Sequence, residues 1–303
     1  MTVVTTGEHG PVQGMDVPHQ VDGSLHCQDI RLTAYRQGPL LARVDAQLQP
    51  GRVTAILGPN GAGKSTLLAA LCGTQPPRQG QVLWDGAPLA QLPAAQRARR
   101  MAVMHQDTQL AFAFTVQEVV EMGRYPHRQH PAPDEAAIVQ HCMQATGVAG
   151  LAQRALASLS GGERARVQLA RALAQIQPEG QAQSGSRWLL LDEPTAALDL
   201  QHQHHAMALV RERSSRDGLG VIVVLHDLNL ALRYADEVLL LPGQGEAALL
   251  GPVHAVLTLP TIARVWRIHG EMQAARDGTP QFIAGAHCAQ LPGMDAPAAS
   301  GAV

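Results

Sequence analysis

Four short apolar runs recur along the chain and constrain its fold more than any other feature of the sequence. They occupy residues 53–57, 188–191, 221–225 and 238–241. Uninterrupted apolar runs of this length are typical of strands that are covered on both faces. Helical patterns follow them at residues 64–72, 162–174 and 228–235. The sequence therefore predicts an α/β fold with a mostly parallel sheet and flanking helices.

The stretch from residue 107 to about 159 lacks such a run and shows helical patterns at residues 116–122 and 136–146. We expect it to be a helical insertion in the α/β core. The first 24 residues and the last fifteen or so are rich in glycine, proline and polar residues without periodicity, as is typical of mobile tails. No repeat of fixed period is visible, which argues against a solenoid.

Composition argues against several classes of protein. The formal net charge is −2 and 16% of the residues are charged, against about 25% in an average soluble protein. The net charge of the chain therefore produces no overall electrostatic attraction to nucleic acid or to an anionic membrane. The four cysteines are scattered without C-x-x-C spacing, which argues against a disulfide framework or a zinc knuckle and fits a reducing, cytosolic location. We expect no secretion signal and no membrane span, since no apolar run approaches ~20 residues.

A glycine-rich motif directly follows the first apolar run. Residues 58–66 read GPNGAGKST and match G-x-x-x-x-G-K-[ST] between a strand and a helix, as a phosphate-binding loop requires. Backbone N–H groups would wrap a phosphate, Lys64 would reach the β- and γ-phosphates, and Ser65 would supply a hydroxyl to Mg²⁺. Lys64 is the only lysine among 23 basic residues, which indicates a place where a compact ammonium is needed. An ordinary glycine-rich turn is the alternative. The predicted phosphate-binding residues are Gly58, Pro59, Asn60, Gly61, Ala62, Gly63, Lys64, Ser65 and Thr66.

A pair of carboxylates follows the second apolar run, in the segment WLLLDEP at residues 188–194. The run would deliver Asp192 at the carboxyl end of a strand, where it would bind Mg²⁺ opposite Ser65. Because side chains alternate along an extended backbone, Glu193 would point elsewhere and could act as the general base that polarises the attacking water. An ordinary acidic strand end is the alternative, and the phosphate-binding loop upstream favours the catalytic interpretation.

A second anion-binding pattern precedes the helix predicted at residues 162–174. Ser160, Gly161 and Gly162 stand before Glu163, so an N-cap hydroxyl and free backbone N–H groups would point outward from the helix start. One nucleotide does not need two such nests from one chain. The surplus predicts that two copies face each other head to tail, each completing the other's site.

The motifs and their order along the chain resemble those of the ATP-binding-cassette (ABC) ATPase family over about residues 25–270. The phosphate-binding loop is Walker A, Gln106 after a strand is the Q-loop, LSGGE is the signature, WLLLDEP is Walker B, Asp199 ends the D-loop, and His226 in VIVVLHD is the switch histidine. The resemblance implies a P-loop NTPase core with a small N-terminal antiparallel β region, and ATP and Mg²⁺ as ligands. It places a tail at residues 1–24, the ATPase domain at 25–270 with the helical insertion at about 107–159, and a C-terminal extension with a mobile end at 271–303.

The resemblance also implies roles for single residues. Gln106 would touch Mg²⁺ or the attacking water, and His226 would contact the γ-phosphate. The turn at residues 160–162 would bind the γ-phosphate of the opposing copy, and Asp199 would contact that copy. Tyr35 lies near the position where the family stacks an aromatic ring on adenine; the alternative for a lone tyrosine is packing in the core or on the surface.

Within the family, a single cassette without a membrane-spanning run favours the importer organisation. The pattern F-x-F-T-V-x-E-V-V-x-M-G-R at residues 112–124 resembles the haem (haemin) importer ATPases of the siderophore, cobalamin and haem uptake group. That resemblance implies a peripheral motor on the cytoplasmic face of the inner membrane, with a homodimer of ATPase subunits, two copies of a permease, a periplasmic haem-binding protein and no nucleic acid as partners. Import of a ferric siderophore or of cobalamin stays open, as does a soluble ABC ATPase of DNA repair or translation.

Three other features have no predicted role. On a helix, the spacing of His202, His204 and His205 splays the first away from the other two, which argues against a metal site. The glutamine- and glycine-rich loop at residues 175–187 and His105 beside Gln106 are also unassigned.

Overall fold

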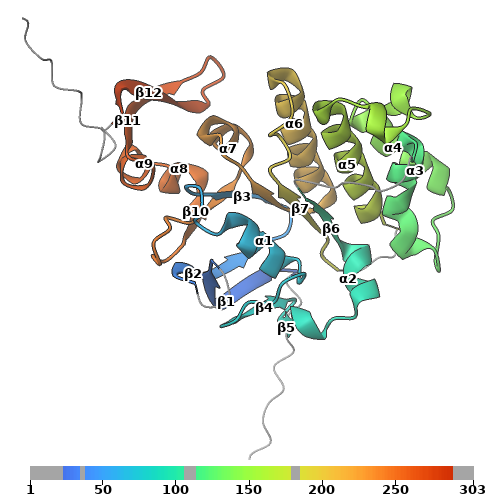
Figure 1. The fold of residues 1–303 in the computed structure, drawn as a ribbon, viewed down its shortest axis with the longest axis horizontal. Helices are drawn as coiled ribbons and strands as arrows, with labels where there is room; N and C mark the ends of the chain where they lie inside the picture. Colours follow the sequence, from blue (N-terminus) through green and yellow to red (C-terminus); the bar gives the residue numbers. More distant parts are fainter. Residues whose placement is uncertain (1–22, 35–37, 106–113, 179–184, 289–303) are drawn as a thin grey trace, which may run out of the picture.

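The structure is a computed structural model and describes residues 23–34, 38–105, 114–178 and 185–288. At its centre is a six-stranded sheet with the strand order β10-β9-β3-β8-β7-β6 (Figure 1). Neighbouring strands are parallel except β10, which is antiparallel to β9. The strands are β3 Val53–Leu57, β6 Met101–Met104, β7 Trp188–Asp192, β8 Gly220–Val224, β9 Glu237–Leu240 and β10 Leu249–Pro252. The mostly parallel sheet is confirmed, and each of the four apolar runs forms a strand.

Both faces of the central strands are buried, as the uninterrupted apolar runs require. Every residue of β3, β7 and β8 is buried. Alternate side chains of β3 belong to different hydrophobic clusters: Ala55 and Leu57 pack into one, and Ile56 packs into the other, together with residues of α1 Lys64–Leu71. Close packing on both sides holds the carboxyl end of β3, from which residues 58–63 lead into α1.

A smaller antiparallel sheet packs into the same cluster as α1. Its strands run in the order β2-β1-β4-β5. They are β1 Leu25–Thr33, β2 Leu40–Leu48, β4 Gln81–Trp84 and β5 Ala87–Pro88. From Ala42 to Leu48, β2 alternates buried and exposed residues, as a sheet with one solvated face requires. The expected N-terminal antiparallel region is therefore present.

The segment that follows β6 is helical in its described part, as predicted. It contains α3 Val116–Glu121, the 3-10 helix η2 Met122–His127, α4 Glu135–Ala145, η3 Ala149–Leu151 and η4 Leu156–Ser158, and it leads into α5 Gly161–Ile176. Helix α3 begins with a capping box, in which Thr115 accepts from the backbone N–H of Glu118 and the Glu118 carboxylate accepts from that of Thr115. The insertion lies at one end of the molecule, against α5 (Figure 1).

Further helices and a C-terminal hairpin complete the described fold. They are η1 Leu89–Gln91, α2 Ala94–Arg100, α6 Leu200–Asp217, α7 Leu228–Tyr234, α8 Val253–Val256 and α9 Leu259–Trp266, with the hairpin strands β11 Ile268–Ala274 and β12 Pro280–Cys288. The hairpin lies beside α7, at the end of the molecule opposite the insertion (Figure 1). Phe282 of β12 joins the larger hydrophobic cluster. The expected domain boundary at residue 270 thus falls inside β11, within a hairpin that packs on the core.

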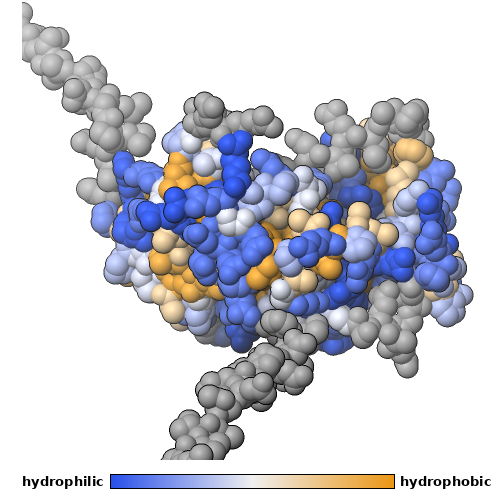
Figure 2. Space-filling model, turned by 90° about the horizontal axis from the view of Figure 1, so that it is seen from below, coloured by the Kyte–Doolittle hydropathy of each residue, from blue (hydrophilic) through white to orange (hydrophobic). Residues whose placement is uncertain are grey.

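Hydrophilic residues cover most of the face shown in Figure 2, and apolar residues are exposed in smaller areas between them. Among the described residues, no helix is both long and apolar enough to cross a membrane. Within the same described ranges, the exposed large hydrophobic residues are Tyr125, Leu200, Leu249, Leu259 and Ile283.

Candidate nucleotide site

The junction of β3 and α1 forms the predicted phosphate-binding loop. Gly58 lies close to the residue that follows β9: a Cβ on Gly58 would be only 2.2 Å from the carbonyl oxygen of Leu241. Gly61 and Gly63 have φ angles of 79° and 99°, in the left-handed region that favours glycine. A Cβ on Gly61 would meet nothing within 4 Å. The loop is therefore open on one side and tightly held on the other, which suits an anion bound by backbone N–H groups.

The side chain of Lys64 folds back over this loop. Its Nζ donates hydrogen bonds to the carbonyl oxygens of Gly58 (2.9 Å) and Pro59 (3.1 Å). Burial lowers the pKa of Lys64, and the nearby carboxylates of Glu193 and Asp192 oppose that shift. A compact ammonium ion fits between backbone carbonyls where a planar guanidinium would not. The geometry agrees with the use of the chain's single lysine at this position.

Ser65 and Asp192 meet across 127 positions of sequence. The Ser65 hydroxyl, in the first turn of α1, donates to Oδ1 of Asp192 at the end of β7 over 3.3 Å. Burial raises the pKa of Asp192, and the hydrogen bond from Ser65 opposes that rise. A hydroxyl beside a carboxylate offers the hard oxygen ligands that Mg²⁺ prefers, so the donor set fits this ion.

Glu193 turns away from Asp192, but for a different reason than the sequence predicted. Strand β7 ends at Asp192, and Glu193 has φ 50°, in the left-handed region, so alternation along an extended strand is the wrong explanation. The turn brings Oε1 of Glu193 to 2.5 Å from Nε2 of His226. His226 itself follows β8 and precedes Asp227, the N-cap of α7. Two neighbouring strands thus deliver a carboxylate and an imidazole in direct contact.

A cleft of about 730 Å³ opens beside these groups, which is within the usual range for small-molecule sites. Its lining residues are Ala34, Leu41, Asn60, Gly61, Gly63, Lys64, Ser65, Thr66, Glu193 and His226. The sequence predicted the last eight of these. Leu41 belongs to β2, and Ala34 directly follows β1. An apolar residue at either position carries no sequence signal of a binding site.

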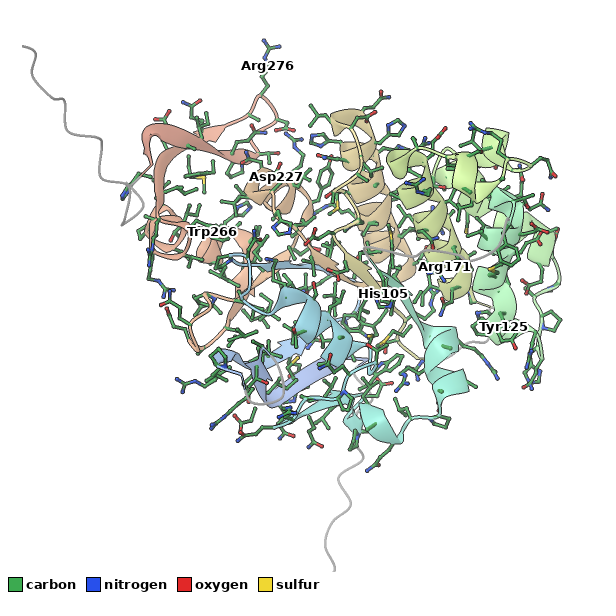
Figure 3. The ribbon with its side chains drawn as sticks, viewed as in Figure 1. His105, Tyr125, Arg171, Asp227, Trp266 and Arg276 are labelled. Atoms are coloured by element: carbon green, nitrogen blue, oxygen red, sulfur yellow. The ribbon has the colours of Figure 1, made fainter. Side chains whose placement is uncertain are left out.

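His105 is a further residue that sequence reasoning left without a role. His105 (labelled in Figure 3) follows β6 directly, and β6 is the neighbour of β7 in the sheet. A positive charge on its imidazole would lower the pKa of Asp192. Its position was the signal that could have identified it: His105 directly follows one strand, and the neighbouring strand in the sheet ends in Asp192.

The signature turn caps α5 and lies outside the lining of the cleft. Ser160 is the N-cap: its hydroxyl accepts from the backbone N–H of Glu163 over 3.2 Å, and Glu163 accepts from the backbone N–H of Ser160 over 2.7 Å. Gly162 approaches the segment before α6, since a Cβ on it would lie 3.0 Å from the carbonyl oxygen of Ala197. Asp199 caps α6 by accepting from the backbone N–H of His202. Within one chain, therefore, residues 160–162 and Asp199 are not brought to the cleft.

Two predicted site residues and the three unassigned histidines of α6 remain. Tyr35 and Gln106 lie outside the described residues. The three histidines of α6 have separate partners: His202 contacts Asp199, His204 contacts the hydroxyl of Tyr234, and His205 contacts the carbonyl oxygen of Ala145.

Comparison with known proteins identifies the family that shares this architecture. The ABC transporter family profile matches residues 41–196. The hemin import ATP-binding protein HmuV of Pseudomonas fluorescens strain Pf0-1 is 51% identical over 213 residues, which cover 70% of this chain and 81% of that protein. HmuV of Gloeobacter violaceus is 51% identical over 220 residues, which cover 72% of this chain and 78% of that protein.

Solved structures agree with the sequence comparison. The dimeric bacterial ABC transporter cassette MJ0796 superposes with a TM-score of 0.65 at 26% identity, over 76% of this chain and 99% of that one. The protein cbiO1 of Clostridium perfringens, part of the ABC transporter complex cbiONQ, gives a TM-score of 0.63 at 28% identity, over 79% of this chain and 92% of that one.

The parallel sheet, the glycine loop and the two side-chain pairs define a P-loop nucleoside triphosphatase. The match to the ABC transporter family covers more than half of the chain. The chain belongs to the ABC transporter family, as an ATP-binding ABC-type ATPase.

Proposed function

We propose that this protein is the ATP-hydrolysing motor subunit of an importer that takes up haem through a separate membrane permease. The observation that carries the motor role is the convergence of Lys64, Ser65, Glu193 and His226 on one cleft. The cargo rests on the 51% identity to hemin import ATP-binding proteins.

In this proposal the phosphates of ATP lie in the loop of residues 58–66. Backbone N–H groups and the start of α1 hold the charge, and Lys64 exchanges its two carbonyl partners for the β- and γ-phosphate oxygens. Ser65 and Asp192, together with Gln106, would hold Mg²⁺, which supplies positive charge against the phosphate oxygens. Tyr35 would stack on the adenine.

Hydrolysis would use Glu193 and His226, which also line the cleft. Glu193 accepts the proton of the attacking water as general base, and His226 orients that carboxylate and contacts the γ-phosphate. Because the left-handed turn at Glu193 separates it from Asp192, the base and the metal-binding carboxylate do not compete for one ligand. Gln106 would help to position the water.

Two copies of the chain would form the working unit. Ser160, Gly161 and Gly162 lie outside the cleft of their own chain. In this proposal the backbone N–H groups of Gly161 and Gly162, in the first turn of α5, bind the γ-phosphate held by a second copy together with the Ser160 hydroxyl. Asp199 would contact the same partner. The dimeric cassette MJ0796, which this fold resembles, supports the pairing. ATP then closes the dimer, and loss of the γ-phosphate releases it.

The dimer would lie on the cytoplasmic face of the inner membrane as a peripheral subunit. Two permease copies would follow its closing and opening through a surface on the helical insertion, and a periplasmic haem-binding protein would deliver the cargo. The low overall charge, −2, gives no support to a nucleic-acid partner. Ferric siderophores and cobalamin are the competing cargoes.

Complementation tests the cargo directly. In a strain deleted for this gene, the wild-type chain should restore growth on haemin as the sole iron source, and the Glu193→Gln variant should not. Restoration only on a ferric siderophore, or only of cobalamin uptake, would assign the other cargo. Co-purification with a many-helix permease from detergent-solubilised membranes tests the assembly, and ATPase activity stimulated by duplex DNA or ribosomes without such a partner would contradict it.

A further inference from the structure

The C-terminal hairpin is joined to the helix that follows the switch histidine. Strand β12 packs beside α7 (Figure 1), and Phe282, only 8% exposed, shares the main hydrophobic cluster with Leu230 and Ala231 of α7. The hairpin therefore packs on the core through the helix that begins two residues after His226.

Asn229 supplies a two-point contact between these elements. Its Nδ2 donates to the carbonyl oxygen of Phe282 over 3.2 Å, and its Oδ1 accepts from the backbone N–H of Phe282 over 2.7 Å. The side-chain amide thereby copies the donor and acceptor of a neighbouring strand residue. Two complementary bonds fix both the position and the rotation of the amide, which a single hydrogen bond or an apolar contact does not do.

A short run of contacts leads from Asn229 to the cleft. Asp227, the N-cap of α7, accepts from the backbone N–H groups of Asn229 (2.7 Å) and Leu230 (3.2 Å). His226 is bonded covalently to Asp227, and its imidazole contacts Glu193. Figure 3 shows Asp227 at the start of α7. The first turn of α7 is therefore held from the hairpin on one side and continues into the His226 backbone on the other.

We propose that Asn229 is a positioning residue for hydrolysis: through it, the C-terminal hairpin holds the first turn of α7 and so keeps the imidazole of His226 against Glu193. This inference rests on the proposed role of His226. It assigns the hairpin, which contributes no residue to the cleft lining, a part in the chemical step.

Kinetics of the full-length protein test the proposal. Asn229→Leu keeps the branching and the number of heavy atoms of the side chain and makes neither bond, and Asn229→Asp keeps only the acceptor for the Phe282 N–H. We expect kcat to fall about tenfold or more for Asn229→Leu and by less for Asn229→Asp, with the Kd for ATP within about twofold of wild type, because the phosphate-binding loop is untouched. Gln273→Leu is the matched control, since its amide donates to Glu271 within the same hairpin.

A merely structural contact would lower the unfolding midpoint of Asn229→Leu and leave kcat of the folded protein unchanged. A kcat within twofold of wild type, or equal losses of kcat and ATP affinity, would overturn the proposal. In the His226→Ala background, single-turnover hydrolysis of radiolabelled ATP should show no further loss from Asn229→Leu. If His226→Ala hydrolyses ATP like wild type, the proposed role of His226 fails; if only His226→Ala is impaired, the inference about Asn229 fails alone.

Discussion

Oε1 of Glu193 lies 2.5 Å from Nε2 of His226, and the two residues follow adjacent parallel strands of the central sheet. The contact depends on the left-handed backbone of Glu193, which turns its side chain out of the line of β7. A non-glycine residue in this region costs on the order of 1 kcal/mol or more. The surrounding strands, buried on both faces, hold the residue in that conformation.

Glu193→Gln should separate ATP binding from hydrolysis. The amide keeps the size of the side chain and loses the basic carboxylate, so turnover should fall by roughly 10²- to 10⁴-fold while ATP affinity is retained. Phosphate release at saturating ATP and titration with a fluorescent ATP analogue measure the two quantities, and size-exclusion chromatography should show an ATP-trapped dimer. Glu212→Gln, at an exposed position on α6, is the control. Turnover near the wild-type value would remove Glu193 from the role of base.

Leu200 should contribute to the dimer. Its side chain is 69% exposed and directly follows Asp199 at the start of α6. If a second copy covers it, Leu200→Ser should weaken the ATP-bound dimer by roughly 10- to 100-fold, as expected for about 1.5–3 kcal/mol of lost apolar burial. Sedimentation of the Glu193→Gln protein with ATP measures this change. Leu259→Ser, on α9 and 39% exposed, should leave the dimer unchanged; equal effects of the two substitutions would argue against a contact at Leu200.

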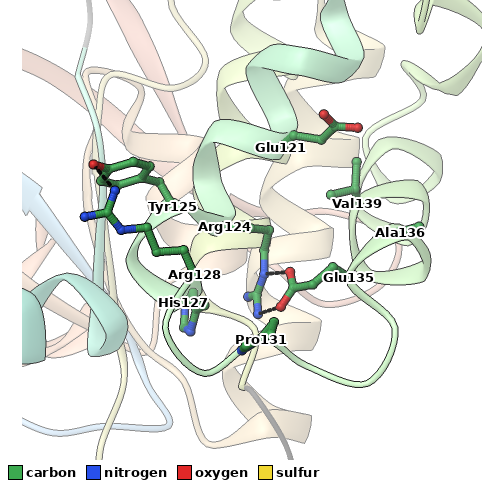
Figure 4. A pocket seen from close by; sticks show the side chains of 9 residues that line it. All are labelled: Glu121, Arg124, Tyr125, His127, Arg128, Pro131, Glu135, Ala136 and Val139. Carbon is green, nitrogen blue, oxygen red and sulfur yellow. Dashed lines mark hydrogen bonds and ion pairs between the residues drawn. The ribbon is translucent and has the colours of Figure 1, made fainter.

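Arg124 should be the main electrostatic tie inside the helical insertion. Figure 4 shows its guanidinium paired with the Glu135 carboxylate, with Nε to Oε2 at 2.5 Å and Nη2 to Oε1 at 3.0 Å. Nη1 also donates to the carbonyl oxygens of Ala174 (2.7 Å) and Gln177 (2.8 Å) at the end of α5. The Arg124 side chain is 6% exposed and that of Glu135 is 30% exposed.

Arg124→Met removes the cation and leaves these acceptors without it, so the free energy of unfolding should fall by about 2–4 kcal/mol. Urea unfolding measures the loss. Arg128→Met, at the exposed neighbour in the same pocket, should cost far less. The double variant Arg124→Met/Glu135→Leu should recover part of the loss, because it removes the unpaired carboxylate. Equal stability of Arg124→Met and Arg128→Met would contradict the assignment.

Asp277 should make the contribution of the hairpin to stability pH-dependent only below about pH 5. The backbone N–H of Thr279 and the guanidinium of Arg233 on α7 lower the pKa of Asp277 from 3.8 to about 2. A pKa that is lower in the folded state contributes stability in full above the unfolded value, and that stability is lost as the pH falls toward 2. The destabilisation caused by Asp277→Asn should therefore be constant above about pH 5 and shrink at pH 4 and pH 3 in urea titrations. A loss that stays the same from pH 5 to pH 3 would rule out this pair as its source.

Much of the core was predictable because its strands are buried on both faces. The runs that became β3, β7, β8 and β9 read as continuous apolar segments, and the glycine loop after β3 has one common structural solution. Strand β1 gave a weaker signal, since it carries a register shift between Cys27 and Ile30 and a left-handed Asp29. Its alternation of buried and exposed residues is broken at that point.

The candidate site was predictable where chemistry and chain position coincide, as for Ser65 and Asp192. Tertiary geometry decided the rest. The backbone turn at Glu193 depends on β8 and His226, and the Asn229 contact depends on a hairpin more than 50 residues away in sequence. Neither has a local signature, because an isolated Asp-Glu or Leu-Asn-Leu segment is compatible with many conformations.

The Nζ of Lys64, which donates to the carbonyl oxygens of Gly58 and Pro59, is also an unusually selective site for chemical labelling. Amine-directed probes meet one side-chain amine in all 303 residues, and that amine belongs to the phosphate loop. The extent of lysine labelling in the intact protein therefore reports directly whether a ligand occupies this loop, because no other lysine side chain contributes to the signal.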